Sequence, residues 1–147
     1  FDFAILLTGV YGNEIFNGSQ RQDLGFTNRP ATILDRWTGE GTSNTVPRFV
    51  MQDNLNLNYR VSDLYIEDGS YLRLKNIQFG YTLPEGILKR MGASVWRFYI
   101  SAENLLTLTK YTGADPEIGA RSSFDIGIDR GIYPQARTWR VGTSITF

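Results

Sequence analysis

The chain has 147 residues, and its 15 lysine and arginine residues balance 15 aspartate and glutamate residues, so the formal net charge is zero. This length allows one domain or a part of one, and the balanced charge disfavours a nucleic-acid-binding protein, which usually carries a clustered basic excess. Cysteine and histidine are both absent, which excludes disulfides, catalysis by either side chain and the usual zinc sites.

The first predicted strand covers residues 1–12, where apolar residues occupy alternate positions. Successive side chains of a strand point to opposite faces, so one face of this segment is apolar. The segment has no leading sequence before its first apolar residue, and we expect the chain to begin inside a larger domain. The apolar face carries Phe1, Phe3, Ile5 and Leu7.

Residues 13–69 form a long polar connection. Soluble domains rarely contain a loop of this length without internal structure, whereas outer-membrane barrels combine long extracellular loops with short periplasmic turns. Its aromatic residues Trp37 and Tyr59 could stack on sugar rings or pack under a partner that covers the loops, and packing is the role we expect. Glu67 and Asp68 are adjacent, so in a strand they point to opposite faces and make a poor catalytic pair.

The second predicted strand covers residues 70–83. Its lower half alternates cleanly, with Ile77, Phe79 and Tyr81 on one face and Asn76 and Gln78 on the other. The upper half breaks the pattern, because the same alternation would put Tyr71, Arg73 and Lys75 on the apolar face. We expect this half either to stand clear of apolar surroundings or to contain a β-bulge.

A short connection at residues 84–92, containing a proline and two glycines, predicts a tight turn or a single helical turn before the third strand. The third strand covers residues 93–108. One face holds Trp96, Phe98 and Ile100, and the other holds Arg97, Tyr99, Ser101 and Glu103. Opposite charges and hydroxyl groups on one face suit a water-filled interior.

A second loop, residues 109–136, contains Asp115 and Glu117, which flank a proline. An Asp-Pro pair in a loop usually starts a turn, so these carboxylates are not predicted to be catalytic. The last strand covers residues 137–147. Its apolar face carries Trp139, Val141, Ile145 and Phe147, and the other face is polar and small.

These patterns predict an all-β protein: an antiparallel up-and-down segment of a transmembrane β-barrel. An apolar band about 25 Å tall, crossed at about 40°, needs about 10 residues per strand, and each predicted strand supplies them. Four strands cannot close a barrel, so further strands must complete it. A soluble carbohydrate-binding β-sandwich remains the alternative, although the long connection at 13–69 disfavours it. A glycoside-acting enzyme is disfavoured because no carboxylates converge.

Three stretches of the sequence resemble one known family. They are SYLRLKNIQFGYTLP (70–84), RFYISAENLLTLTKYTGADPE (97–117) and GIDRGIYPQARTWRVGTSITF (127–147). In this order and spacing they resemble the C-terminal end of the SusC/RagA-type TonB-dependent outer-membrane transporters of Bacteroidetes. The end of the last strand also resembles the final-strand pattern of outer-membrane barrels, which the barrel-assembly machinery engages. That pattern falls on Arg140, Gly142, Ile145 and Phe147.

The resemblance implies the last four strands of a barrel of about 22 strands with a plugged lumen. It implies energised import of a nutrient, such as an oligosaccharide or a peptide, across the outer membrane. The implied partners are the rest of the barrel and the plug, a SusD-like surface lipoprotein, TonB (through an N-terminal part not in this chain), the barrel-assembly machinery and membrane lipid. No cofactor, metal site, catalytic residue or nucleic-acid partner is expected.

In such a barrel, the periplasmic side would hold Phe147 and the turn at 84–92, and the loops at 13–69 and 109–136 would be extracellular. One set of side chains is predicted to face lipid: Trp96, Phe98, Ile100, Ile77, Phe79, Tyr81, Trp139 and Val141. Another set is predicted to face the lumen. Some of its members could meet the substrate, but we expect them mainly to line and stabilise the watery interior: Asn76, Gln78, Arg97, Tyr99, Ser101 and Glu103.

Overall fold

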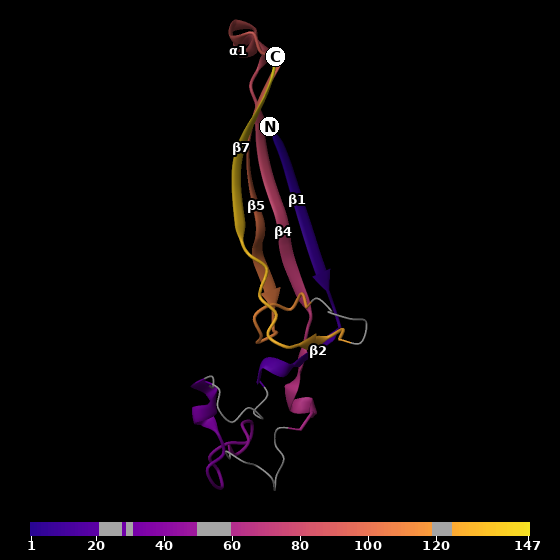
Figure 1. The fold of residues 1–147 in the computed structure, drawn as a ribbon, viewed down its shortest axis with the longest axis vertical. Coiled ribbons are helices and arrows are strands. Elements are labelled where there is room, and N and C mark those ends of the chain that lie inside the picture. The colour runs from indigo at the N-terminus through magenta and orange to yellow at the C-terminus, as the bar shows by residue number, and fades with distance from the viewer. Residues whose placement is uncertain (21–27, 29–30, 50–59, 119–124) are drawn as a thin grey trace.

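The computed structural model describes residues 1–20, 28, 31–49, 60–118 and 125–147. Its main feature is a long four-stranded sheet in the order β1-β4-β5-β7, in which every neighbouring pair is antiparallel (Figure 1). The strands are β1 (Asp2–Val10), β4 (Tyr71–Thr82), β5 (Val95–Thr109) and β7 (Thr138–Thr146). The chain is therefore mostly β, and the bounds of these strands differ from the ranges predicted from sequence by one or two residues.

A second, smaller sheet lies where β1 ends and β4 begins (Figure 1). It has the order β3-β2-β6, with β6 parallel to β2. Its strands and the short 3-10 helices beside it are β2 (Glu14–Asn17), η1 (Gly18–Gln20), η2 (Ala31–Asp35), η3 (Asp63–Tyr65), β3 (Ile66–Asp68) and β6 (Ile128–Asp129). The segments between the long strands thus contain ordered elements of their own.

The most buried apolar side chains of this end belong to the connections between the long strands. Ile15, Tyr65 and Tyr111 are each at most 6% exposed, and Phe16 packs edge-on against Tyr65 with ring centroids 6.0 Å apart. Burial of such side chains favours a fixed conformation through the hydrophobic effect. These connections therefore form a small core at this end of the sheet.

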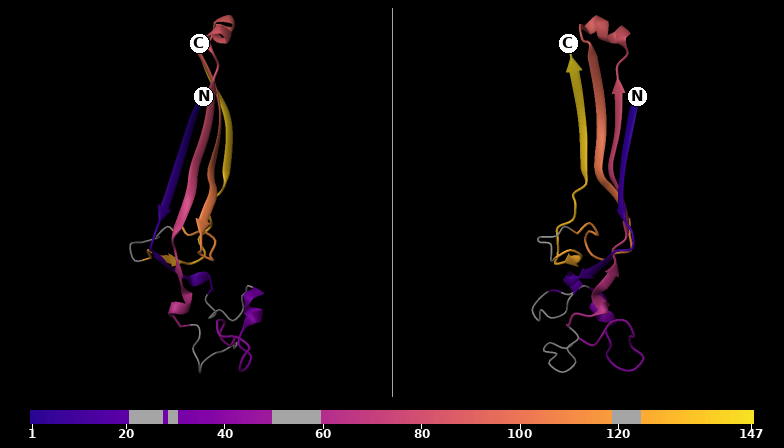
Figure 2. Two further views of the ribbon diagram at one scale, coloured as in Figure 1. Left: turned by 180° about the vertical axis from the view of Figure 1, so that it is seen from behind. Right: turned by 90° about the vertical axis from the view of Figure 1, so that its right-hand side faces the viewer.

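The opposite end of the sheet is closed by α1 (Glu85–Met91), which connects β4 to β5 beside the C-terminus (Figure 2). Gly92 ends the helix with φ of 67°, in the left-handed region that glycine adopts without steric cost. The connection predicted at 84–92 is therefore a short helix. None of the helices in the described part of the chain is long and apolar enough to cross a membrane.

The upper half of β4 contains the bulge that was one of the two interpretations of its sequence. The register with β1 shifts between Leu6 and Leu7, and the register with β5 shifts between Leu74 and Asn76. A one-residue shift exchanges the two faces of a strand. Leu72 and Leu74 therefore continue the apolar face of Ile77, and Arg73 lies on the polar face.

The long sheet is a single layer. Across the described residues, no helix or strand packs over its apolar face, and the sheet seen from the side in Figure 2 has no second layer beside it. Large apolar side chains consequently stay exposed, including Phe98 at 41% and Val141 at 82%. A β-sandwich would bury these residues against a second sheet.

Candidate functional site

The strand register divides the side chains of the sheet into two faces. Residues that pair directly across antiparallel strands share a face. Phe79 pairs with Phe3 and Ile100, and Tyr81 pairs with Phe98. By the same register, all eight residues predicted to face lipid lie on this apolar face: Trp96, Phe98, Ile100, Ile77, Phe79, Tyr81, Trp139 and Val141.

The opposite face is polar and contains all six residues predicted to face a lumen. Gln78 pairs with Ser101, and Ser101 in turn pairs with Arg140. The other members of this face follow from the same register: Asn76, Arg97, Tyr99 and Glu103. The structure thus brings each predicted set together on one face of the sheet.

Two ion pairs connect strands across the polar face. Arg97 on β5 donates to Asp2 on β1, with Nη2 2.5 Å and Nε 3.2 Å from the two carboxylate oxygens. Arg140 on β7 donates from both terminal guanidinium nitrogens, Nη1 and Nη2, to Glu103 on β5, and Nη2 lies 3.1 Å from Oε2. A forked arginine–carboxylate pair fixes orientation as well as distance. These pairs help hold the strands in register.

Gly142, predicted as part of the assembly signal, has a second role in the structure. It pairs with Tyr99, and a Cβ atom on Gly142 would lie 2.5 Å from the Tyr99 ring. Tyr99 also pairs with Gly80 on its other side. A side chain at position 142 would therefore force the Tyr99 ring to move. The other three members of the predicted signal are Arg140, Ile145 and Phe147.

We expect Gly142→Ala to destabilise the folded protein by about 1–3 kcal/mol, because an added methyl group in a filled site forces its neighbours to move. The urea midpoint of the complete folded protein measures this effect. Tyr99→Ala should recover most of the loss in the double variant, since the ring is the atom group that clashes. Loss of the same size in the presence and absence of Tyr99 would contradict this explanation.

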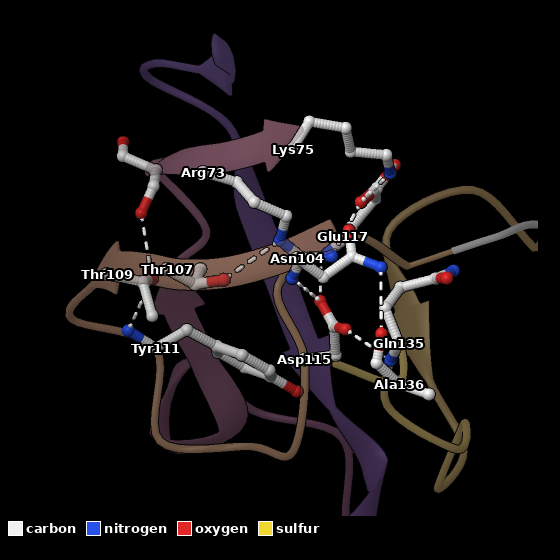
Figure 3. A network of polar contacts seen from close by, with 11 residues as sticks. Arg73, Lys75, Asn104, Thr107, Thr109, Tyr111, Asp115, Glu117, Gln135 and Ala136 are labelled. Atoms are coloured by element: carbon white, nitrogen blue, oxygen red, sulfur yellow. Dashed lines mark hydrogen bonds and ion pairs between the residues drawn. The ribbon is translucent and has the colours of Figure 1, made fainter. Parts of the chain in front are cut away.

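A buried ionic cluster lies at the loop end of the polar face (Figure 3). We call Arg73, Lys75, Thr107, Asp115 and Glu117 the Arg73 cluster. Arg73 donates from Nε to the Thr107 hydroxyl at 2.9 Å, from Nη1 to Glu117 at 2.7 Å, and from Nη2 to Asp115. Lys75 binds Glu117 with both oxygens 2.8 Å from Nζ.

The same cluster is connected to the backbone of the loop. Asp115 accepts hydrogen bonds from the backbone N–H groups of Gln135 and Glu117, both at 2.9 Å. Nearby, the Asn104 amide donates to the Ala136 carbonyl at 3.0 Å, and Asn104 itself has φ of 52°. Asparagine is one of the few non-glycine residues that adopts this left-handed conformation readily. Both limbs of the loop are thus attached to the sheet.

The Arg73 cluster is neutral overall, with two cations and two carboxylates. Arg73 is 2% exposed and Asp115 7% exposed, so neither charge is well solvated. Burial by itself raises the pKa of Asp115. Hydrogen bonds from the N–H of Gln135, the Arg73 guanidinium and the N–H of Glu117 together lower the pKa by more than burial raises it, so the pKa lies below its usual value. Asp115 therefore stays ionised at neutral pH.

Two further carboxylates, Glu67 and Asp129, hold the loops to each other through hydrogen bonds. Glu67 accepts from the Asn17 amide, the Thr112 hydroxyl and the Thr112 N–H, each at 2.8 Å. Tyr111 donates to Asp129 at 2.6 Å, and burial together with that carboxylate raises the pKa of Tyr111. These carboxylates have structural partners, and across the described residues no group of three or more acidic side chains is placed to hold a metal ion.

The Arg73 cluster was missed in the sequence, although a signal was present. Two cations stand two residues apart in SYLRLKN, and two carboxylates stand two residues apart in GADPE. That spacing puts each pair on one side of an extended chain, so the two pairs can meet. Both stretches belong to the segments that carried the family resemblance.

The loop aromatic Trp37 is partly exposed. Its backbone N–H donates to the Val46 carbonyl at 2.9 Å, which closes a loop of residues 37–46. With Asn44 and Thr45, Trp37 lines a shallow hollow on the surface of this loop. It is therefore neither fully packed nor freely exposed at 37%. Tyr59 lies outside the described residues.

Comparison with known proteins gives relatives along the whole chain. The chain is 38% identical to TonB-dependent receptor P3 of Formosa agariphila over 100% of its own length and 15% of that protein. It is 34% identical to TonB-dependent receptor SusC of Bacteroides thetaiotaomicron, again over 100% of the chain and 14% of that protein. The chain therefore spans about one seventh of the curated relatives it matches.

Solved structures give a similar result. The structure of the RagAB peptide transporter matches with a TM-score of 0.78 and 26% identity, covering 99% of this chain and 16% of that one. The RagAB peptide importer in its closed-closed state matches with a TM-score of 0.77 and the same identity, covering 99% and 15%. No family model matches the chain.

Proposed function

Because the chain is a segment of a SusC/RagA-type TonB-dependent receptor, we propose that it forms wall and loops of an outer-membrane β-barrel that imports a nutrient. The long sheet would contribute the last four strands of a barrel of about 22 strands. The nutrient class is an oligosaccharide or a peptide, and the RagAB structures are those of a peptide transporter. The relatives are named as receptors and transporters, and we propose no enzymatic activity.

The observation that carries this proposal is a broad apolar face over which no described helix or strand packs. On this face Phe98, Trp139 and Val141 are 41% to 82% exposed. In water this arrangement would expose a broad apolar surface, which soluble monomers avoid. In a bilayer the apolar face meets acyl chains and the polar face meets the hydrated interior.

The height of the apolar face fits a bilayer. On β4 it extends from Leu72 to Tyr81, as the register with β1 and β5 defines it. A stretch of this length, inclined at about 40°, spans about 25 Å, the height of the apolar band of outer-membrane barrels. Both edge strands, β1 and β7, have one unpaired side, and further strands would have to cover them because lipid offers no hydrogen bonds.

The orientation follows from the two ends of the sheet. The C-terminus and α1 lie together at one end, and the small sheet with the long loops lies at the other (Figure 1). Short turns face the periplasm and long loops face outward in outer-membrane barrels. We therefore place α1 in the periplasm and the segments between β1 and β4 and between β5 and β7 at the cell surface.

The implied partners follow from this placement. A SusD-like surface lipoprotein would cover the extracellular loops, and TonB would act through a plug outside this chain. The rest of the barrel would pair with β1 and β7. Strand β7 carries the predicted assembly signal and has one free edge. We propose that the barrel-assembly machinery engages this strand. The signal consists of Arg140, Gly142, Ile145 and Phe147.

Two positions on β7, three residues apart, test the proposal. Spin labels at Val141→Cys and Ser144→Cys in the complete receptor would report opposite surroundings, because the two residues lie on opposite faces. We expect the label at position 141 to collide with oxygen, which concentrates in lipid. The label at position 144 should collide with a water-soluble nickel chelate. Low access of both oxygen and the chelate to the label at position 141 would show instead that a second layer buries this face, as in a β-sandwich.

A further inference from the structure

We propose that residues 110–118 fold back inside the barrel and line its pore at the level of the outer leaflet, held there by the Arg73 cluster. This inference rests on the proposed barrel. It assigns a pore-lining role to a segment that the chain order alone places among the extracellular loops.

The first argument is the path of the segment. The chain leaves the sheet at Thr109, which pairs with Tyr71 at the loop end of β4. Asp115 then contacts Arg73, and Glu117 contacts both Arg73 and Lys75. From Tyr71 to Lys75 the strand rises by about 13 Å at 3.3 Å per residue. The segment therefore turns back along the sheet instead of continuing away from it.

The second argument is what lies across the wall at the same level. Leu72 is 47% exposed, Leu106 is 50% exposed and Leu108 is 57% exposed, all on the apolar face. In the proposed barrel, this level of the wall is in contact with acyl chains. The segment lies against the other side of the same wall, so it is inside the barrel and at membrane depth.

The third argument is that both ends of the loop between β5 and β7 are held in place: residues 110–118, which follow β5, and residues 135–136, which precede β7. The Arg73 cluster holds Asp115 and Glu117, and Glu67 holds Thr112. The returning limb is tied by the Gln135 N–H to Asp115 and by the Ala136 carbonyl to Asn104 (Figure 3). Breaking a buried ionic network is costly, so the folded-back position is the stable one.

The consequence concerns the width of the pore. Asp115 and Pro116 are buried against the sheet, whereas Thr112 and Ala114 are exposed. A backbone segment on the inner side of the wall narrows the passage, and its exposed small residues define how closely a solute can pass. Ala114 is therefore a position at which the size of the solute is limited.

Cysteine labelling of the complete receptor in lipid nanodiscs tests this placement. Three single-cysteine variants are compared: Ala114→Cys, Leu34→Cys on η2, which is 73% exposed at the loop end, and Val141→Cys on the apolar face. Each is reacted with N-ethylmaleimide and with a polyethylene-glycol maleimide too wide for the pore. We expect the small reagent to label positions 34 and 114 and the wide reagent to label position 114 about tenfold or more slowly than position 34, because labelling requires local opening.

A companion variant tests the role of the cluster. Asp115→Asn with Glu117→Gln should bring the rate of the wide reagent at position 114 close to that at position 34. If this variant does not fold, the inference is still tested by the labelling rates at positions 34 and 114 in the protein that keeps Asp115 and Glu117. Equal rates of the wide reagent at positions 34 and 114 in that background would overturn the inference. Rapid labelling of position 141 by the polyethylene-glycol maleimide would instead overturn the proposed barrel.

Discussion

Arg73→Gln should destabilise the loop end of the sheet by about 3–5 kcal/mol, the usual cost of removing one partner from a buried ion pair. Asp115 would remain 7% exposed with its carboxylate charge and without the guanidinium that lies against it. Hydrogen exchange of the complete receptor, read by mass spectrometry, measures the effect as loss of protection in residues 110–118.

Lys89→Gln is the matched control, because it also removes one positive charge from an ion pair. Lys89 lies 3.7 Å from Glu85 on α1, with both side chains at least 80% exposed. Exposed i,i+4 pairs contribute about 0.5 kcal/mol or less. A similar loss of protection in both variants would show that Arg73 has no special role.

One further variant separates charge from geometry in the Arg73 cluster. Arg73→Lys keeps the charge but cannot bind Thr107, Asp115 and Glu117 through a planar fork, so an intermediate loss of hydrogen-exchange protection is expected.

Because the pKa of Asp115 is lowered in the folded protein, the contribution of its charge to stability is present above the ordinary aspartate pKa and disappears as pH falls through the folded value. Protection of residues 110–118 should therefore persist at pH 5.

In the proposed barrel, Val141→Arg should cost the folded state about 2–4 kcal/mol, the range for a cation placed on the lipid face near the middle of the bilayer. Val141 is 82% exposed on the apolar face, and it pairs with Ile100. Urea-dependent folding of the complete receptor into lipid vesicles measures the difference in free energy.

Ser144→Arg provides the control on the same strand. Ser144 lies on the polar face, where its direct partner is Arg97, so a cation there would remain in water and cost far less. Equal losses at positions 141 and 144 would contradict the assignment of the two faces. A smaller loss at Val141 than at Ser144 would mean that the faces are reversed.

The family resemblance and the two faces of the lower sheet could be predicted from the sequence. The alternation of Trp96, Phe98 and Ile100 with Arg97, Tyr99 and Ser101 leaves one arrangement, because the side-chain period of a strand is fixed at two. The relatives confirm the SusC/RagA resemblance. That these faces meet lipid and a lumen remains a prediction of the proposed barrel.

The upper half of β4 shows where alternation stops being sufficient. Its sequence allowed a bulge but could not place one, since a bulge depends on how β1 and β5 pair with β4. The register shift beside Lys75 decided that Arg73 joins the polar face. One extra residue was enough to exchange the two faces.

The sequence by itself determined the period of the strands, the apolar length of each strand and the family, because these depend on neighbouring residues and on stretches of fixed order. Only the tertiary structure decided that Arg73 meets Asp115, 42 residues further along the chain, and that the Tyr99 ring lies where a Cβ atom of residue 142 would be. Such contacts depend on the register between strands and on the path of a loop. No periodicity within a single segment encodes either of them.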